Sequence, residues 1–359
     1  MRLIIDSHLD LAWNALFWNR DLMEPLATLR EREAHMTDHR ARGRATVSLP
    51  EMRAGGVALC LGTILARTNS HLRPAEGFRR RDLDYGSQDI AHAIGQGQLA
   101  YYKLLNHRGS IKLIQTADDL RHHWAQLATN ADSPLGLIVA MEGADPIVTP
   151  AQAEEWFGAG LRVVGLAHYG PSAYAVGTGA TGPLTTGGIE LLREMKRLRM
   201  ILDLTHCCDE SFHQALDVFD GPILASHNNC RALVPGDRQF SDEQIRLLIA
   251  RNAVIGVALD AWMLYPNWKV GQTDRAVLPL SSVADHIDHM CQLAGNSSHV
   301  GIGSDLDGGF GTEQTPTGLD SIADLQKLDA ILASRGYSHD DIAAVFHGNW
   351  LRFFISSLP

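Results

Sequence analysis

Residues 3–13 read LIIDSHLDLAW, and this stretch carries the first indication of the fold. Residues 3–5 are apolar, as in a buried strand. Side chains alternate along a strand, so Asp6, His8 and Asp10 are expected to share one face. Polar groups that project from a core strand cost free energy unless something pairs them. A metal ion and a hydrogen-bond network are the two explanations, and this stretch alone leaves both open.

Similar apolar runs recur along the chain and alternate with amphipathic segments. This alternation predicts βαβ units and a parallel sheet. Eight such runs favour an α/β fold of the (β/α)₈ TIM-barrel type, with a shorter ninth run at 111–115 as an extra edge strand. A doubly wound sheet is the alternative, but no GxGxxG follows the first run, which weakens its dinucleotide-binding form. The eight runs are 3–8, 57–65, 135–143, 161–169, 200–206, 222–227, 253–259 and 299–305.

The segments between these runs have helical patterns, which we expect at 187–199, 209–219 and 241–252. Asp209 and Ser241 are good candidates for the N-caps of the last two helices.

The 359 residues suit one large domain, and we expect a single barrel over 1–359. The longest stretch without a clean pattern is 66–108, which ends in a predicted helix at 90–105. In a barrel this segment would form a lid or insert over strand 2. It contains the basic run Arg79–Arg81, for which a solvated surface is the simplest interpretation.

Composition excludes several classes of function. The formal net charge is −10, from 31 Lys and Arg against 41 Asp and Glu, which argues against a nucleic-acid partner. No apolar run has the length of a membrane span, and MRLIIDSHLD lacks the features of a signal peptide. The five cysteines are odd in number, and reduced thiols in the cytoplasm are the simplest expectation.

Ionisable side chains stand where the predicted strands end. In a barrel these ends converge on the C-terminal face, which is where active sites lie. One histidine at a strand end would carry little weight, but six strands ending in this way favour a single site over separate core residues. The residues are His8 and Asp10, Glu142, His168, His206, His227 and Asp305.

Imidazoles and carboxylates without thiolates suit zinc and comparable divalent metals. The set is large enough for about two ions bridged by a carboxylate. On this interpretation His8 and Asp10 hold one ion, His206 and His227 hold the other, and Glu142 bridges them.

Two neighbours of these residues have competing interpretations. Cys207 and Cys208 follow His206, so a thiolate ligand is one option, but packing at a helix start is the simpler one. Asp6 is either an acceptor that orients His8 or a cap for backbone amides.

Several motifs, in this order, resemble those of one known family, the membrane (renal) dipeptidases and their bacterial relatives, the M19 metallopeptidases. The resemblance runs through nearly the whole chain. The motifs are DSHLDLAW, MEGAD, LTTGGIELLREMKRLRMILDLTH, ASHNNCRAL, PGDRQFSDEQI, GIGSDLDG and HGNWLRFF.

The resemblance implies a barrel with a dinuclear zinc centre that hydrolyses dipeptides through a metal-bridged hydroxide. His8, Asp10, Glu142, His206 and His227 match the family's metal ligands, with Glu142 bridging. His168 matches the histidine that contacts the substrate and polarises the scissile carbonyl. Arg238 matches the arginine for the substrate carboxylate, with Arg231 as the nearby competitor. Asp305 matches the acid that meets the free amine, with Asp307 as the structural alternative, and Trp13 matches an aromatic residue beside the pocket.

The resemblance also implies a homodimer, and tolerance of a D residue at the C-terminal position of the dipeptide is a further expectation. The chain departs from the family pattern in the segment after His168, which reads YGPSA, and at Arg199, where glycine is common. The departures bear on substrate preference and leave every matched ligand in place.

Two alternatives remain open. One is another binuclear-metal hydrolase on the same barrel, acting on a lactone, an ester or an N-acyl substrate. Many such enzymes open with His-x-His, whereas this chain has His8-x-Asp10, which favours the dipeptidase. The other is a barrel that binds small peptides without catalysis. Its mark would be a missing metal ligand, and the matched ligands are all present.

Overall fold

The computed structural model describes residues 1–69, 83–127 and 133–359, so the predicted basic run Arg79–Arg81 lies outside the described residues. Contacts between Cα atoms group the chain into two compact units. The first comprises residues 1–10, 20–60 and 226–353, and the second comprises 11–19, 61–225 and 354–359.

The parallel strands follow the order β10-β11-β1-β2-β6-β7-β8-β9, which is the cyclic order of a (β/α)₈ barrel. The predicted fold class is therefore confirmed. The short run at 111–115 is also a strand, β5 (Ile111–Leu113), which pairs with β6 outside this path, as expected for an extra edge strand. β1 and β6 are buried along their whole length, as in a parallel sheet covered on both faces.

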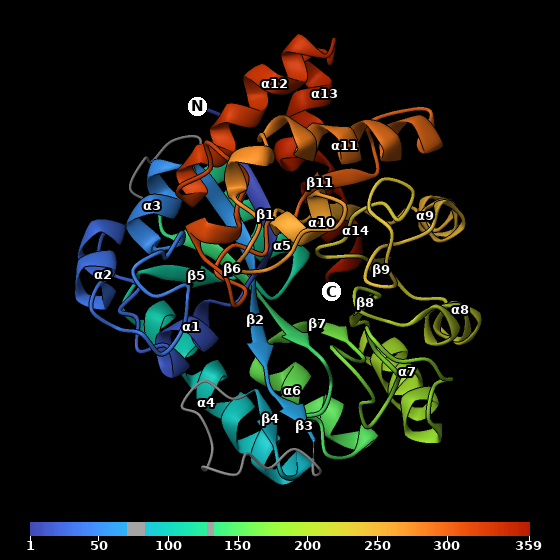
Figure 1. The fold of residues 1–359 in the computed structure, drawn as a ribbon. Helices are drawn as coiled ribbons and strands as arrows, with labels where there is room; N and C mark the ends of the chain where they lie inside the picture. The colour runs from blue at the N-terminus through green and yellow to red at the C-terminus, as the bar shows by residue number, and fades with distance from the viewer. Residues whose placement is uncertain (70–82, 128–132) are drawn as a thin grey trace. The chain divides into compact units, whose positions relative to one another are not determined.

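The first unit contains three complete strands and helices that flank them (Figure 1). In register, Asp6 of β1 lies opposite Ile302 of β11, and Ile255 of β10 lies opposite Val300. The strands are β1 (Ile4–Leu9), β10 (Ile255–Val257) and β11 (Val300–Ile302), with the start of β2 (Val57–Leu65). The helices are α2 (Leu26–Glu33), α3 (Leu49–Ala54), α9 (Asp242–Ala250), α10 (Ala261–Leu264), η2 (Arg275–Val277), α11 (Ser281–Ala294), η3 (Thr312–Gln314), η4 (Ile322–Lys327), α12 (Leu328–Ser334), α13 (His339–Ala343), η5 (Ala344–Gly348) and the start of α14 (Asn349–Ser357).

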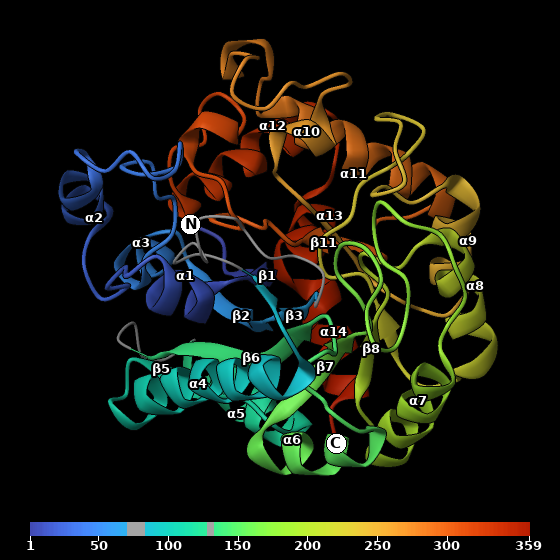
Figure 2. The ribbon, with the colours of Figure 1, turned by 60° about the horizontal axis from the view of Figure 1, so that its bottom comes forward.

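The second unit contains the last four strands of the order, from β6 to β9, and the end of β2. The long helix α4 lies next to β5 (Figure 2). Gly95 lets this helix come close to Pro146 and Trp156, because a Cβ added at this position would lie 3.1 Å from Pro146 and 3.2 Å from Trp156. The strands are β3 (Arg67–Thr68), β4 (Asp84–Tyr85), β5, β6 (Leu135–Glu142), β7 (Leu161–Gly165), β8 (Ile201–Asp203) and β9 (Ile223–Leu224). The helices are α1 (Leu11–Phe17), α4 (Gln88–His107), α5 (Ala117–Leu127), η1 (Pro150–Gln152), α6 (Ala153–Ala159), α7 (Thr186–Leu198) and α8 (Asp209–Val218).

Most predicted helices are confirmed, but one predicted cap is wrong. Ser241 caps α9 through a capping box with Gln244. Asp209 is not the N-cap of α8: the helix already begins at this residue, and Cys208 precedes it in an extended conformation. α7 ends at Arg199 in the left-handed conformation, with φ +57°, which explains why glycine suits this position.

The helix predicted at 90–105 lies within α4, whereas the lid role of 66–108 and the single-domain organisation stay predictions.

Several strands are shorter than predicted. β7, β8, β9 and β11 end three residues before His168, His206, His227 and Asp305, respectively. The predicted site residues on these strands therefore lie in the loops that follow the strands. The turns are sharp, because His206 and Asp305 have φ of +67° and +58°.

The carbonyl oxygen of Ser226 is enclosed by backbone at the ends of the first unit's strands. A Cβ added at Gly256 or Gly303 would lie 2.0 Å or 1.9 Å from this oxygen. The Ser7 hydroxyl also donates to it. Only glycine fits at the two positions, and this close packing fixes the backbone next to His227.

Candidate metal centre

One group of donor residues lies in the first unit. Nε2 of His8 lies 3.8 Å from Oδ1 of Asp10 and 3.7 Å from Oδ1 of Asp305. The ring planes of His8 and His227 are tilted by 33° to each other, with 3.6 Å between the ring centroids. His8, Asp10 and His227 are buried. The first unit thus brings together four of the residues predicted from strand ends.

Backbone contacts set the positions of these donors. Oδ1 of Asp6 accepts hydrogen bonds from the backbone N–H of Ser304 at 2.8 Å and of His8 at 3.2 Å. Asp6 therefore caps backbone amides, which is one of its two predicted roles. These hydrogen bonds join β1 to the residues that follow β11. Glycine at position 308 leaves room for the carboxylate of Asp305, because an added Cβ would lie 2.0 Å from Oδ1 and would displace it.

A second group lies in the second unit. Nε2 of His206 lies 3.2 Å from Oε1 of Glu142, and Nε2 of His168 lies 3.7 Å from the same oxygen. The two imidazole rings meet edge to face, with centroids 4.3 Å apart. The register of β6 on β7 shifts between Val139 and Ala140, close to the strand end that carries Glu142.

Hydroxyl groups face the Nδ1 atoms of three of the four histidines. Ser226 Oγ lies 2.9 Å from Nδ1 of His227 and 3.5 Å from Nδ1 of His8. Thr178 Oγ1 lies 3.0 Å from Nδ1 of His206. A hydroxyl oxygen can accept from Nδ1–H, which leaves the Nε2 lone pair for a metal.

The chemistry of both groups fits a divalent metal. In each unit, donor atoms lie within 4.8 Å of one another: those of His8, Asp10 and Asp305 in the first, and those of Glu142, His168 and His206 in the second. Imidazole and carboxylate are ligands that zinc accepts. Burial and the Arg238 charge lower the pKa of His8 to about 3, which keeps its imidazole in the neutral form that metals bind.

The thiolate option for Cys207 receives no support. Cys207 and Cys208 are buried just before α8, and the donor groups found among the described residues include neither sulfur atom. Both pack as the simpler interpretation expects.

Arg238 is buried beside the donors of the first unit. Its Nη2 donates to the carbonyl oxygen of His227 at 2.9 Å. Its Nη1 is buried and has no hydrogen-bond partner among the described residues. The competitor Arg231 is half-buried and donates its Nε to the carbonyl oxygen of Gln239. The buried Nη1 of Arg238 is therefore suited to donate a hydrogen bond to an anionic group of a ligand.

Asp260 is a residue of this region that the sequence interpretation missed. It directly follows the apolar run 253–259, so the strand-end signal was present. Burial raises its pKa to about 7, and Oδ1 accepts a hydrogen bond from Gln314 Nε2 at 2.8 Å. Burial and the charges of Asp10, Asp260 and Asp6 also raise the pKa of Asp305, while Arg238 opposes this rise.

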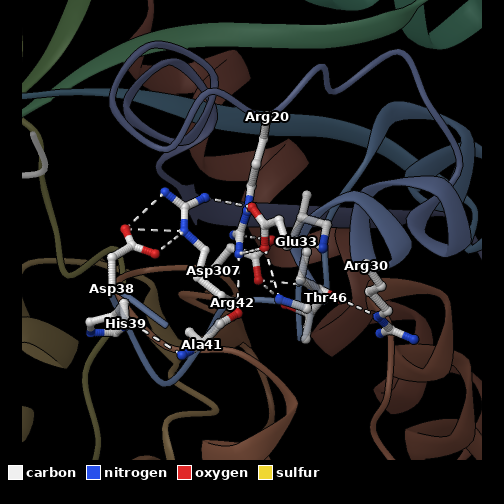
Figure 3. Close-up of polar contacts among 12 residues, drawn as sticks. Arg20, Arg30, Glu33, Asp38, His39, Ala41, Arg42, Thr46 and Asp307 are labelled. Carbon is white, nitrogen blue, oxygen red and sulfur yellow. Dashed lines mark hydrogen bonds and ion pairs between the residues drawn. The ribbon is translucent and has the colours of Figure 1, made fainter. Parts of the chain in front are cut away.

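Asp307, the alternative to Asp305, has a structural role (Figure 3). It accepts hydrogen bonds from Thr46 N and Oγ1, both at 2.7 Å, and from Val47 N at 3.1 Å. Arg20 pairs with Asp307 and, through Nε and Nη2, with Glu33 at 2.9 and 3.0 Å. These contacts anchor the loop that carries Asp305.

Trp13 lies in α1 and is buried, with its ring edge-on to Trp18 at 5.7 Å between centroids. Its predicted contact with substrate stays a prediction.

Among the described residues no helix combines the length and apolar character needed to cross a bilayer.

A parallel (β/α)₈ order with imidazole and carboxylate donors at and just after its strand ends is an arrangement suited to metal binding. Residues 2–356 match the family model of the membrane dipeptidases (Peptidase family M19), and the chain belongs to this family. An uncharacterized dipeptidase of Schizosaccharomyces pombe is 29% identical over 256 residues, which cover 70% of this chain. The match spans only 56% of that protein's length.

Two solved structures share the fold. One is described as a dipeptidase of metallopeptidase family M19, with a TM-score of 0.79, 23% identity and 99% of each chain covered. The other is a metallopeptidase from Rhodobacter sphaeroides liganded with a phosphinate mimic of the dipeptide L-Ala-D-Ala. Its TM-score is 0.77 at 23% identity, with 100% of this chain and 99% of that chain covered.

Proposed function

We propose that this protein is a zinc-dependent dipeptidase. The observation that carries the proposal is the pair of buried imidazole–carboxylate groups in a chain of the M19 family. We assign His8, Asp10, Glu142, His206 and His227 as ligands for about two zinc ions, with Glu142 shared. When bound, such ions supply Lewis-acid polarisation of the carbonyl and a water of lowered pKa.

The selection of dipeptides follows from charge at both ends of the substrate. Arg238 has a buried Nη1 donor available for the terminal carboxylate. Asp305 lies in the negative field of Asp10 and Asp260, which favours an ammonium group. A longer peptide would have to place one of its charged ends elsewhere.

His168 is assigned to the oxygen of the scissile carbonyl. A hydrogen-bond donor directed at the developing oxyanion lowers the barrier more than one directed at the ground state. We also propose that the enzyme accepts a D residue at the C-terminal position, because a structural neighbour of the same fold binds a mimic of L-Ala-D-Ala.

The five cysteines of this chain are free thiols, which favour a reducing compartment, and we propose that the protein resides in the cytoplasm.

The test is turnover of an L,L and L,D dipeptide library by the full chain, stripped of metal and reloaded with zinc. N-acetylated and C-amidated forms of the best substrate complete the panel. We expect hydrolysis of the free dipeptides, weak hydrolysis of both blocked forms, and about two zinc equivalents by elemental analysis.

Glu142→Gln should lose both metal and turnover, whereas the exposed Glu243→Gln serves as the matched control. Hydrolysis of esters or lactones in place of dipeptides would move the chain to another hydrolase class. Binding of dipeptides by the zinc-loaded protein without turnover would make it a carrier.

A further inference from the structure

His168 differs from the other three histidines of the two donor groups in the partner of its Nδ1 atom. His8, His206 and His227 have hydroxyl oxygens at this position. Nδ1 of His168 instead lies 3.3 Å from Nη1 of Arg67. Arg67 was not among the residues predicted from the sequence.

The position of Arg67 is fixed by two carboxylates. Arg67 and Asp84 are register partners in the β3–β4 ladder, and Arg67 Nη2 donates to Asp84 Oδ2 at 2.8 Å. Asp145 accepts from the backbone N–H of Thr68 at 2.7 Å and from Ser172 Oγ at 2.8 Å. Asp145 thereby joins β3 to the loop that carries His168.

A guanidinium group donates hydrogen bonds and accepts none. Nδ1 of His168 must therefore be the acceptor in its contact with Arg67, and the proton of the neutral ring resides on Nε2. This Nε2 faces the site, 3.7 Å from Oε1 of Glu142. Hydroxyl partners impose no such restriction, because a hydroxyl oxygen both donates and accepts.

We propose that Arg67, held by Asp84, is a positioning residue that fixes His168 as the Nε2–H tautomer. In this form Nε2 of His168 carries a proton, so it donates a hydrogen bond to the substrate and cannot ligate a metal. His168 does so even though it lies close enough to Glu142 and His206 to share a metal with them. The assignment rests on the proposed dipeptidase function for the identity of the group that receives the hydrogen bond. The tautomer itself is independent of that function.

The tautomer is measured directly by NMR of the full chain with ¹⁵N-labelled histidine, without metal and with zinc. The His168 signals are assigned by their loss in His168→Gln. We expect the ¹⁵N shift of a protonated Nε2 and of an unprotonated Nδ1 in both states. A proton on Nδ1 in either state would overturn the proposal, whatever the protein hydrolyses.

Variants at position 67 test the consequence for catalysis. Arg67→Lys keeps a partner that only donates, whereas the amide oxygen of Arg67→Gln can accept from Nδ1–H. We expect Arg67→Gln to lower kcat about 10- to 100-fold with a much smaller change in KM, and Arg67→Lys to retain most of kcat. Zinc content should stay at the wild-type value in both variants, because His168 is not a ligand.

Asp84→Asn loosens Arg67 without touching His168, and we expect a smaller fall in kcat. Arg197→Gln removes an exposed arginine of the same unit and is the matched control. Equal losses of kcat in Arg67→Gln and Arg67→Lys, or loss of zinc from Arg67→Gln, would overturn the assignment. If the wild-type chain hydrolyses no dipeptide, the proposed function fails while the NMR result still decides the tautomer.

Discussion

Arg20 and Asp307 form an ion pair inside the first unit, with 3.4 Å between Nη1 and Oδ2 and almost no exposure of either side chain. Arg20 also binds Glu33, so its removal leaves two buried carboxylates short of a partner. We expect Arg20→Met to lower the free energy of unfolding by about 3–5 kcal/mol. Urea denaturation of the metal-free protein measures this value. Arg121→Met, which breaks an exposed pair with Asp118, is the control and should leave the midpoint unchanged.

Stability should fall at acid pH because of His286. Burial lowers its pKa from 6.5 to about 3, and its Nδ1 accepts a hydrogen bond from Cys230 N at 3.1 Å. Below pH 6.5 the unfolded chain takes up a proton that the folded chain does not bind, so stability is lost as pH falls toward 3. Because of this residue, the free energy of unfolding falls by up to about 1.4 kcal/mol for each pH unit in this range.

His286→Gln keeps an acceptor for Cys230 and removes the titration. Urea denaturation at about pH 7.5 and about pH 5 should therefore show a smaller loss of stability in the variant than in the wild type. The exposed His122→Gln should retain the wild-type slope. Parallel slopes for wild type and His286→Gln would contradict the prediction.

Metal affinity should depend on the hydroxyl groups behind the histidines. Ser226→Ala removes the acceptor for His227 and His8, and Thr178→Val removes that for His206. We expect each change to weaken zinc binding about 10- to 100-fold. Competition with a chromophoric chelator gives the affinities. Unchanged affinity in both variants would show that these hydroxyls do not support ligands.

The carboxylate clamp is tested at Arg238. We expect Arg238→Met to raise KM for free dipeptides about 10- to 100-fold and to change KM for C-amidated dipeptides much less. Arg231→Met is the matched comparison, since Arg231 is engaged with the carbonyl oxygen of Gln239. A larger effect at Arg231 would transfer the clamp to that residue.

The strand order was predictable because the apolar runs are long and separated by clear helical patterns. The strand ends were not, because four strands end three residues before the predicted site residue while the apolar run continues. Apolar loop residues such as Leu166 and Ala167 are buried like strand residues, so hydrophobicity alone does not separate the two.

Two residues that the sequence interpretation missed, Asp260 and Arg67, differ in kind. Asp260 carried the same strand-end signal as the predicted donors and could have been found. Arg67 gave no local signal, because its role depends on a contact with His168, 101 positions away. Pairings of this kind arise from tertiary packing and are not encoded in any short pattern.

The glycines around the Ser226 carbonyl oxygen have a consequence for engineering. Random mutagenesis at positions 256 and 303 should return almost only inactive clones, because every other amino acid would collide with that oxygen. Libraries that aim at new substrates are better directed to the exposed Tyr169 and Pro171, which leaves the Ser172–Asp145 hydrogen bond intact. Substitutions at these exposed positions leave the backbone packing unchanged, whereas substitutions at Gly256 and Gly303, next to the Ser226 carbonyl oxygen, do not.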